Sequence, residues 1–482
     1  MIRSSLPKHQ RRFLRSAVVA SLALAVASGA GFVASPAIAA KQPSGPKLNL
    51  TKPFQTAAAA ANKAMDEAKA RPDVVAAQGN VTTARTAYQQ SRGTARTQAK
   101  ANYDAAVTAL GATLTAEKAQ LDAAFAAIGN QDDRYTYGQL AIQLGGLSQD
   151  QVIQRRGINA MIESGKPTAA DLPRLQFFAG QLAMDARDFT AARTSLHAAV
   201  AGGYHENDAD AILAEAYLAD NQTAQGLTIL QQAIDYRGTT PNPAPASWYR
   251  RGLGAAYKAG LLDQAGNFAN GLVKAHPSAD NWAGAVTVVR EVGKYPAQET
   301  LDLMRLMGRT NSYAEERDFI EYIQAADARR LPGEVQKVVE AGLAAGKLRA
   351  GDPFVVEART TAAARYAADR ASLPGFERDA RAGAATAATA MGAGDAFLSY
   401  GEAGKAAELY ALALTKPGVD MPRVLTRLGI AQLDSGKPAE AQATFGRVTG
   451  PRAAIARLWA IYAEQRVRAA APAVAAPVAP AK

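Results

Sequence analysis

The sequence has 482 residues, contains no cysteine and carries a formal net charge of +11. The lack of cysteine excludes disulfides, thiolate metal sites, cysteine catalysis and a lipid anchor on an amino-terminal cysteine. Residues 1–40 hold five basic and no acidic side chains, so the rest of the chain carries 11 − 5 = +6. This small excess does not predict nucleic-acid binding. It is compatible with ordinary solubility or with an anionic envelope polymer as a partner.

Residues 1–40 have the pattern of an export signal. Basic residues come first, an apolar run over 17–27 follows them, and a small-residue cleavage site lies at Ala37-Ile38-Ala39. The basic residues before the apolar run are Lys8, Arg11, Arg12 and Arg15. We expect a cleaved signal and a periplasmic mature chain. The general secretory route is favoured over the twin-arginine route, because Phe13 directly follows the arginine pair. An uncleaved membrane anchor is the alternative.

The mature chain is expected to begin with a linker and a helical region. Residues 41–55 are rich in proline and glycine, which favours an extended linker. Residues 56–132 are rich in alanine with a thin apolar stripe, which favours helices. Pro72 and Gly79 interrupt this region, and no repeat spacing is visible in it. We therefore expect a separate amino-terminal helical region of long hairpins or a coiled-coil-like arm. No stretch beyond residue 40 is long and apolar enough to span a bilayer.

A spacing of small and large residues recurs further along the chain. A small residue is followed by a second small residue twelve positions on, a large apolar one four further, and a small or apolar one three beyond that. The pattern occurs at Gly180/Ala192/Leu196/Ala199, Ala214/Gly226/Leu230/Ala233, Gly394/Ala406/Tyr410/Ala413 and Gly429/Ala441/Phe445/Val448. The first two sets start 34 residues apart and the last two 35. The spacing predicts pairs of antiparallel helices that approach closely at the small residues.

Two further units fit the spacing less well. The unit around Gly254 and Tyr257 reaches its next small residue, Ala265, one position early, and the loop over 239–245 before it is long. A looser copy runs through Ile323, Val335, Val339 and Gly342, with Pro332 placed to open a helix.

These units resemble the tetratricopeptide repeat (TPR), in the type found in exported bacterial proteins. The resemblance implies an all-α fold, a right-handed α–α superhelix, over residues 133–468. The clearest repeats occupy 173–277 and 387–450. A terminal capping helix is expected through Ile455, Leu458, Trp459 and Tyr462, because the last repeat exposes an unpartnered apolar face. The Pro- and Ala-rich tail over 469–482 is expected to be disordered.

Candidate catalytic and metal-binding residues have simpler explanations. Glu163-Ser164 matches two residues of a lytic transglycosylase motif, but Gly165 follows as a helix stop and the rest of the motif is missing. The residues around His205 and Asp208 lie at a turn, where Asn and Asp ordinarily cap the next helix. We expect no catalytic residue, cofactor or metal.

The resemblance also implies a concave groove lined by the first helix of each repeat. In the block of residues expected to line it are Arg174, Phe177, Gln181, Asp185, Asp208, Glu215, Leu218, Trp248, Arg251 and Lys258. The later pair of repeats adds Met391, Asp395, Arg423 and Asp434. An exposed Phe177 and Trp248 among charged residues would suit a peptide partner. The alternative is that both aromatic residues fill gaps between repeats.

The sequence therefore favours a non-catalytic exported scaffold that binds a protein or peptide partner of the cell envelope in its groove. An accessory factor of exopolysaccharide or peptidoglycan assembly is the first alternative. It would contact an anionic glycan through Trp248, Arg251 and Lys258. A glycan-cleaving enzyme is the second alternative.

Overall fold

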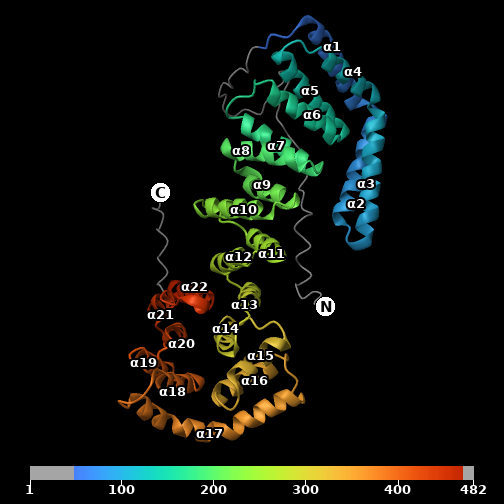
Figure 1. The fold of residues 1–482 in the computed structure, drawn as a ribbon. Coiled ribbons are helices and arrows are strands. Elements are labelled where there is room, and N and C mark those ends of the chain that lie inside the picture. The colour runs from blue at the N-terminus through green and yellow to red at the C-terminus, as the bar shows by residue number, and fades with distance from the viewer. Residues whose placement is uncertain (1–47, 471–482) are drawn as a thin grey trace, which may run out of the picture. The chain divides into compact units, whose positions relative to one another are not determined.

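The computed structural model describes residues 48–470. The expected export signal, the first part of the expected linker and nearly all of the expected tail lie outside this range. The chain divides into two compact units, with the boundary between Tyr236 and Arg237. Residues 48–470 contain helices and no strand (Figure 1), which confirms the all-α prediction.

The first unit contains nine helices and most of a tenth. They are α1 (Lys52–Ala70), α2 (Pro72–Gln90), α3 (Gly93–Thr113), α4 (Thr115–Ala126), α5 (Gln131–Ser148), α6 (Gln151–Glu163), α7 (Leu172–Asp185), α8 (Phe189–Ala201), α9 (Ala209–Ala219) and α10 (Thr223–Gly238).

The helices α1 and α4 pair with each other although α2 and α3 lie between them in the sequence. Helix α1 begins inside the segment expected to be a linker. Phe54 and Met65 of α1 and Leu121 of α4 share one core cluster with Tyr137 and Leu140 of α5. The expectation of a separate region over 56–132 is therefore wrong for α1 and α4. Their apolar stripe is thin, but the face of α5 completes its burial.

The helices α2 and α3 form an arm inserted into this first hairpin. They pack along each other, and Val74, Val81 and Leu110 belong to their own small core cluster. Pro72 stands at the start of α2, where a missing N–H costs nothing, so it opens a helix rather than interrupting one. Gly79 is accommodated inside α2.

The recurring spacing marks the points where paired helices approach most closely. A Cβ at Gly180 would lie 2.5 Å from Leu196 Cγ, and one at Gly429 would lie 2.5 Å from the Phe445 ring. The partners are 196 − 180 = 16 and 445 − 429 = 16 residues apart. Each large side chain of the second helix therefore fills the space that a glycine of the first helix leaves open. The predicted TPR-like hairpins are confirmed at these positions.

The third unit follows the same spacing from a different glycine. A Cβ at Gly252 would lie 2.4 Å from the Phe268 ring, again 268 − 252 = 16 residues away, whereas nothing lies within 4 Å of a Cβ at Gly254. The prediction that this unit is aligned on Gly254 is therefore wrong. The unit is in the same register as the others, and the long loop before it does not shift it.

The second unit contains the helices α11 to α22. They are α11 (Ala246–Lys258), α12 (Leu262–Ala275), α13 (Ala279–Gly293), α14 (Ala297–Arg309), α15 (Glu316–Ala326), α16 (Pro332–Ala344), α17 (Pro353–Arg381), α18 (Ala387–Ser399), α19 (Ala403–Ala413), α20 (Met421–Asp434), α21 (Pro438–Phe445) and α22 (Ala453–Ala470). Pro332 opens α16, as predicted.

Helix α22 closes the second unit on itself. The helix was expected to cap α21, and it also packs against α12, α13 and α14. Trp459 Nε1 donates to the Asp302 carbonyl oxygen at 3.0 Å, Tyr462 Oη to the Arg309 carbonyl oxygen at 3.1 Å, and Gln465 Nε2 to that of Val273 at 2.7 Å. The interior of this unit is therefore occupied by the chain itself.

A buried cluster of charges holds this closure. Asp302 of α14 is fully buried and accepts from Arg452 Nη1 at 2.6 Å, while Arg427 Nε of α20 lies 3.4 Å from its Oδ1. Arg305 pairs with Glu334 through two nitrogens, both at 2.7 Å. Burial raises the pKa of Asp302, but the guanidinium groups around it outweigh this effect and hold that pKa below its usual value of 3.8.

Three residues expected to line a groove belong to this closure. Asp395 is buried and accepts from Tyr410 Oη at 2.7 Å. Arg423 Nη2 donates to Gln298 Oε1 at 2.6 Å, and Arg309 Nε donates to Asp434 Oδ1 at 2.7 Å. The prediction that they face a partner is wrong, because α14 and α22 take up the space beside them.

Two neighbouring glycines of α11 offer a test of the hairpin contact. We expect Gly252→Ala to destabilise the protein by about 1–3 kcal/mol, because the new methyl group would overlap the buried Phe268 ring. We expect the matched control Gly254→Ala to be neutral or stabilising by up to about 1 kcal/mol, through helix propensity. Urea midpoints measure both effects. Equal midpoints for the two variants would contradict the packing described.

A second prediction concerns the closure. We expect Arg427→Ala to destabilise the second unit by about 3–5 kcal/mol, because it leaves Asp302 and Asp395 buried with fewer counter-charges. Hydrogen exchange of the α14 and α22 amides measures the effect, and Arg447→Ala on the exposed surface is the control.

The contribution of Asp302 has a defined pH dependence. Its folded pKa lies below the unfolded one, so its stabilisation is present above about pH 3.8 and is lost as the pH falls below that value. The difference between Arg427→Ala and the unmodified protein should then narrow in acid. A difference that stays constant with pH would contradict the role given to Asp302.

Candidate binding surface

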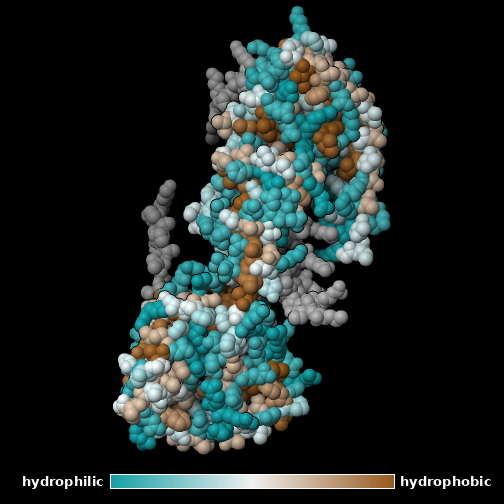
Figure 2. Space-filling view, in the orientation of Figure 1, coloured by the Kyte–Doolittle hydropathy of each residue, from teal (hydrophilic) through white to brown (hydrophobic). Residues whose placement is uncertain are grey.

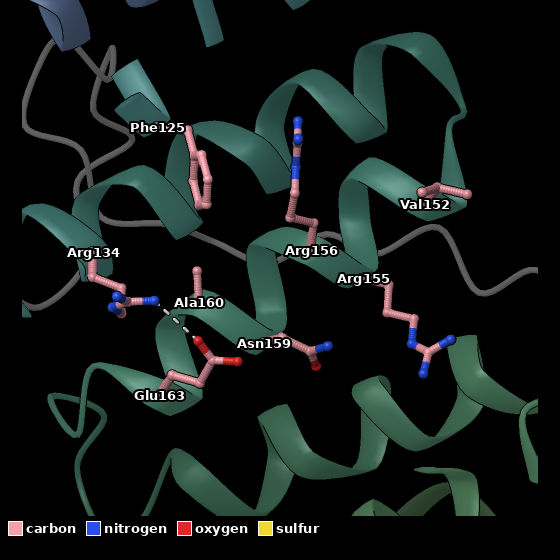
Figure 3. Close-up of a pocket in the computed structure, with 8 residues that line it drawn as sticks. All are labelled: Phe125, Arg134, Val152, Arg155, Arg156, Asn159, Ala160 and Glu163. Atoms are coloured by element: carbon pink, nitrogen blue, oxygen red, sulfur yellow. Dashed lines mark hydrogen bonds and ion pairs between the residues drawn. The ribbon is translucent and has the colours of Figure 1, made fainter. Parts of the chain in front are cut away.

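A surface pocket of about 370 Å³ lies along one face of α6 in the first unit (Figure 3). It is lined by one residue of α4, one of α5 and six of α6: Phe125, Arg134, Val152, Arg155, Arg156, Asn159, Ala160 and Glu163. The α6 residues recur at intervals of three and four, so they share one side of that helix.

The opposite face of α6 fixes this orientation. A Cβ at Gly138 of α5 would lie 2.6 Å from the carbonyl oxygen of Gly157, so these helices touch nearly backbone to backbone. Ile153, Ile158 and Met161 are buried on that side. Helix α6 is capped by Asp150, whose side chain accepts from the N–H groups of residues 152 and 153. The pocket face is therefore turned outward on a helix that is held in place.

Each arginine of the pocket is paired with a carboxylate. Arg134 Nη1 lies 3.1 Å from Glu163 Oε2, within the pocket itself. The other two reach neighbouring helices, because Arg156 Nη2 lies 3.0 Å from Asp122 of α4 and Arg155 Nη2 lies 2.5 Å from Asp188 at the start of α8. The hydrogen bond from Arg155 lowers the pKa of Asp188. The two outer pairs link successive hairpins.

Two large apolar side chains are exposed beside these charges. Phe125 is 48% and Val152 78% exposed. The Arg156 guanidinium lies 5.9 Å from the ring centroids of both Phe125 and Tyr137, within the range of a cation–π interaction. Figure 2 shows separate hydrophobic areas within the mainly hydrophilic surface of this unit. Aromatic and arginine side chains at one place are typical of protein-binding surfaces.

Of the expected groove residues in the first unit, Phe177 is buried. It is 1% exposed, and its ring centroid lies 4.9 Å from that of Tyr204. Arg174 is exposed and lies 3.6 Å from Asp171. The remaining residues differ in exposure: Asp185 and Asp208 are exposed, and Gln181, Glu215 and Leu218 are half-buried. None of them lines the pocket on α6.

The expected groove residues of the second unit behave similarly. Trp248 is 7% exposed, with the Arg237 guanidinium 5.5 Å from its ring. Arg251 is half-buried and Lys258 exposed, while Met391 is half-buried. Phe177 and Trp248 thus fill gaps between helices, which is the alternative that the sequence left open. The prediction that they are exposed is wrong, because each lies on the buried face of its helix.

The pocket was not predicted from the sequence, apart from the attention given to Glu163. A usable signal was present. Asp122 and Arg156 are 156 − 122 = 34 residues apart, and Arg155 and Asp188 are 188 − 155 = 33 apart, which is the repeat length. Opposite charges separated by one repeat indicate neighbouring hairpins, and the Arg155-Arg156 pair stands where two such links meet.

The sites considered for catalysis and metal binding have structural roles. Helix α6 ends at Glu163, and Gly165 has a φ of 65°, so the predicted glycine stop is confirmed. Glu163 is exposed and paired with Arg134, without the burial that a glycoside-cleaving general acid uses. His205 Nδ1 lies 2.9 Å from Asp210. Asp208 stands at the start of α9 but makes no side-chain cap, contrary to the prediction.

Searches over residues 48–470 gave two further results. No group of three or more His, Cys, Asp or Glu side chains there could hold a metal ion. No helix in that range has the length and apolar character needed to cross a membrane.

The comparisons with known proteins gave fold relatives alone. No family model and no curated protein matches the chain. A TPR protein from Parabacteroides merdae is 13% identical over 54% of this chain and 99% of its own, with a TM-score of 0.24. The TPR2AB domain of yeast Sti1, in a complex with pHSP90, is 16% identical over 62% of this chain and 95% of its own, with a TM-score of 0.22. The APC/C hetero-tetramer Cut9–Hcn1 gives 12%, 68% and 66%, with a TM-score of 0.23.

These superpositions are too loose to align one whole chain on another. The TPR-like character of the hairpins therefore rests on their own geometry, the sixteen-residue pairing of a glycine with a large side chain. The described chain is an all-α protein built from TPR-like helical hairpins.

Proposed function

We propose that the protein is a non-catalytic scaffold of the cell envelope that binds a protein or peptide partner through the pocket face of α6. The observation that carries the proposal is the exposure of Phe125 and Val152 beside three arginines on a fixed helix. Exposed apolar groups and arginines together are the residues that contribute most at protein interfaces.

The surface is formed before any partner arrives. The close contact of α5 and α6 at Gly138 and Gly157 and the Asp150 cap hold α6 in place. The ion pairs of Arg155 and Arg156 tie it to the neighbouring hairpins. A preformed surface lowers the ordering cost of association, which is the advantage of a solenoid as a scaffold.

This proposal changes the face that the sequence favoured. The pocket lies on the second helix of its hairpin, whereas the expected groove lay on first helices. Arg174, Gln181 and Glu215 on α7 and α9 remain candidates for a wider contact, since they are exposed or half-buried. In the second unit the corresponding space is filled by α14 and α22.

The proposed export makes a prediction about the mature chain. We expect cell fractionation to place the protein in the periplasm and amino-terminal sequencing to find a chain that begins at residue 40 or 41, because the small-residue site ends at Ala39. A full-length chain in the membrane fraction would show that the segment is retained as an anchor. A full-length chain in the cytoplasm would contradict export.

Site-specific photocrosslinking in living cells tests the binding surface. A photoreactive phenylalanine analogue at Val152 should give one dominant protein adduct, because that side chain is 78% exposed in the pocket. The same analogue at Val75, a 52% exposed valine on the arm, is the matched control and should give no such adduct.

Other outcomes would favour other functions. Absence of an adduct at Val152, together with sedimentation of the purified protein with envelope polysaccharide, would support the accessory role in glycan assembly. Release of soluble fragments from peptidoglycan that is lost in Glu163→Gln would support the glycan-cleaving alternative. The same adducts at both valines would contradict the assignment of the surface.

A further inference from the structure

We infer that the pocket face of α6 takes an acidic protein segment that carries one large apolar side chain. The inference rests on the proposed protein-binding function and adds the chemistry of the partner. It follows from the charge of the pocket, from the kind of ion pairs that its arginines make, and from the position of its apolar groups.

The pocket lining has an excess of positive charge. It contains three arginines and one carboxylate, Glu163. The carboxylates that balance Arg155 and Arg156 belong to Asp188 and Asp122, which lie on neighbouring helices outside the lining. A partner approaching α6 therefore meets guanidinium groups first, and carboxylates of the partner complement them.

The existing ion pairs can be exchanged. The side chains of Asp122 and Asp188 are 62% and 43% exposed, and Arg156 is 40% exposed. Ion pairs of such exposure contribute at most about 1 kcal/mol each, because water and salt screen them. A carboxylate from a partner can replace or share them at little cost, whereas the buried pairs of the second unit could not be exchanged in this way.

The apolar groups set the length and composition of the segment. Val152 and Glu163 are eleven residues apart on α6, so the pocket face is about 16 Å long. An extended chain of about five residues covers that distance. Phe125 and Val152 are the exposed apolar groups of the lining, so one Leu, Phe or Trp of the partner has a surface to cover. An acidic glycan would satisfy the charges and leave these side chains in water.

Selection from a library of random dodecapeptides displayed on phage tests the inference on the full-length protein. We expect the selected peptides to share two or more Asp or Glu residues next to a Leu, Phe or Trp. Selection against Arg155→Glu/Arg156→Glu should remove this acidic preference. Because that double variant also breaks two links between hairpins, its fold is checked by circular dichroism.

A conservative variant keeps the test decisive if the double variant is unstable. Asn159→Asp adds a negative charge to the pocket with nearly the same shape and removes no ion pair. It should weaken binding of a fluorescent copy of the selected peptide about tenfold. Asn102→Asp on the exposed surface of α3 is the control and should leave binding unchanged. Binding should also weaken as salt rises.

Several results would overturn the inference. They are the lack of a shared motif, a basic or uncharged motif, and a motif that binds Asn159→Asp as well as the unmodified protein. Equal competition by polygalacturonate would assign the face to an acidic glycan instead. The proposed function fails separately, since a protein adduct at Val152 whose binding segment lacks acidic residues would keep the scaffold and reject its chemistry.

Discussion

Close approach of two helices within each hairpin is the constraint on which the structure depends. Gly180, Gly252 and Gly429 each lack the Cβ that would meet a large side chain sixteen residues later. The same principle at Gly138 and Gly157 brings α5 and α6 together backbone to backbone. Since one face of α6 is committed to that contact, the other face must be turned outward. The pocket is thus a consequence of hairpin packing and needs no element of its own.

Arginine–carboxylate pairs serve opposite purposes in the two units. In the first unit they lie at the surface between successive hairpins, where screening makes each of them weak and exchangeable. In the second unit Asp302 and its arginines are buried, so that removing one partner strands a charge in a place that water cannot reach. Exposure, and not the chemistry of the pair, decides whether it can take part in recognition or fixes a shape.

The periodic part of the fold could be predicted because its contacts are local. Gly180 and Leu196 are sixteen residues apart, and so are Gly429 and Phe445, so one spacing reveals them. The burial of Trp248 was not predictable in this way, since helical spacing alone does not say which side a neighbouring helix covers. The closure of the second unit and the pocket on α6 combine residues from several helices, and no window of sequence contains them.

The closure through α22 also bears on how the second unit reaches its native state. Trp459 and Asp302 are separated by 157 positions in the chain, and Arg452 and Asp302 by 150. Contacts of such long range carry a large loop-closure entropy and slow the search for the native topology. During synthesis α14 must therefore wait, its carboxylate unmatched, until the last helix leaves the ribosome. In the first unit each hairpin can form as soon as its own two helices exist.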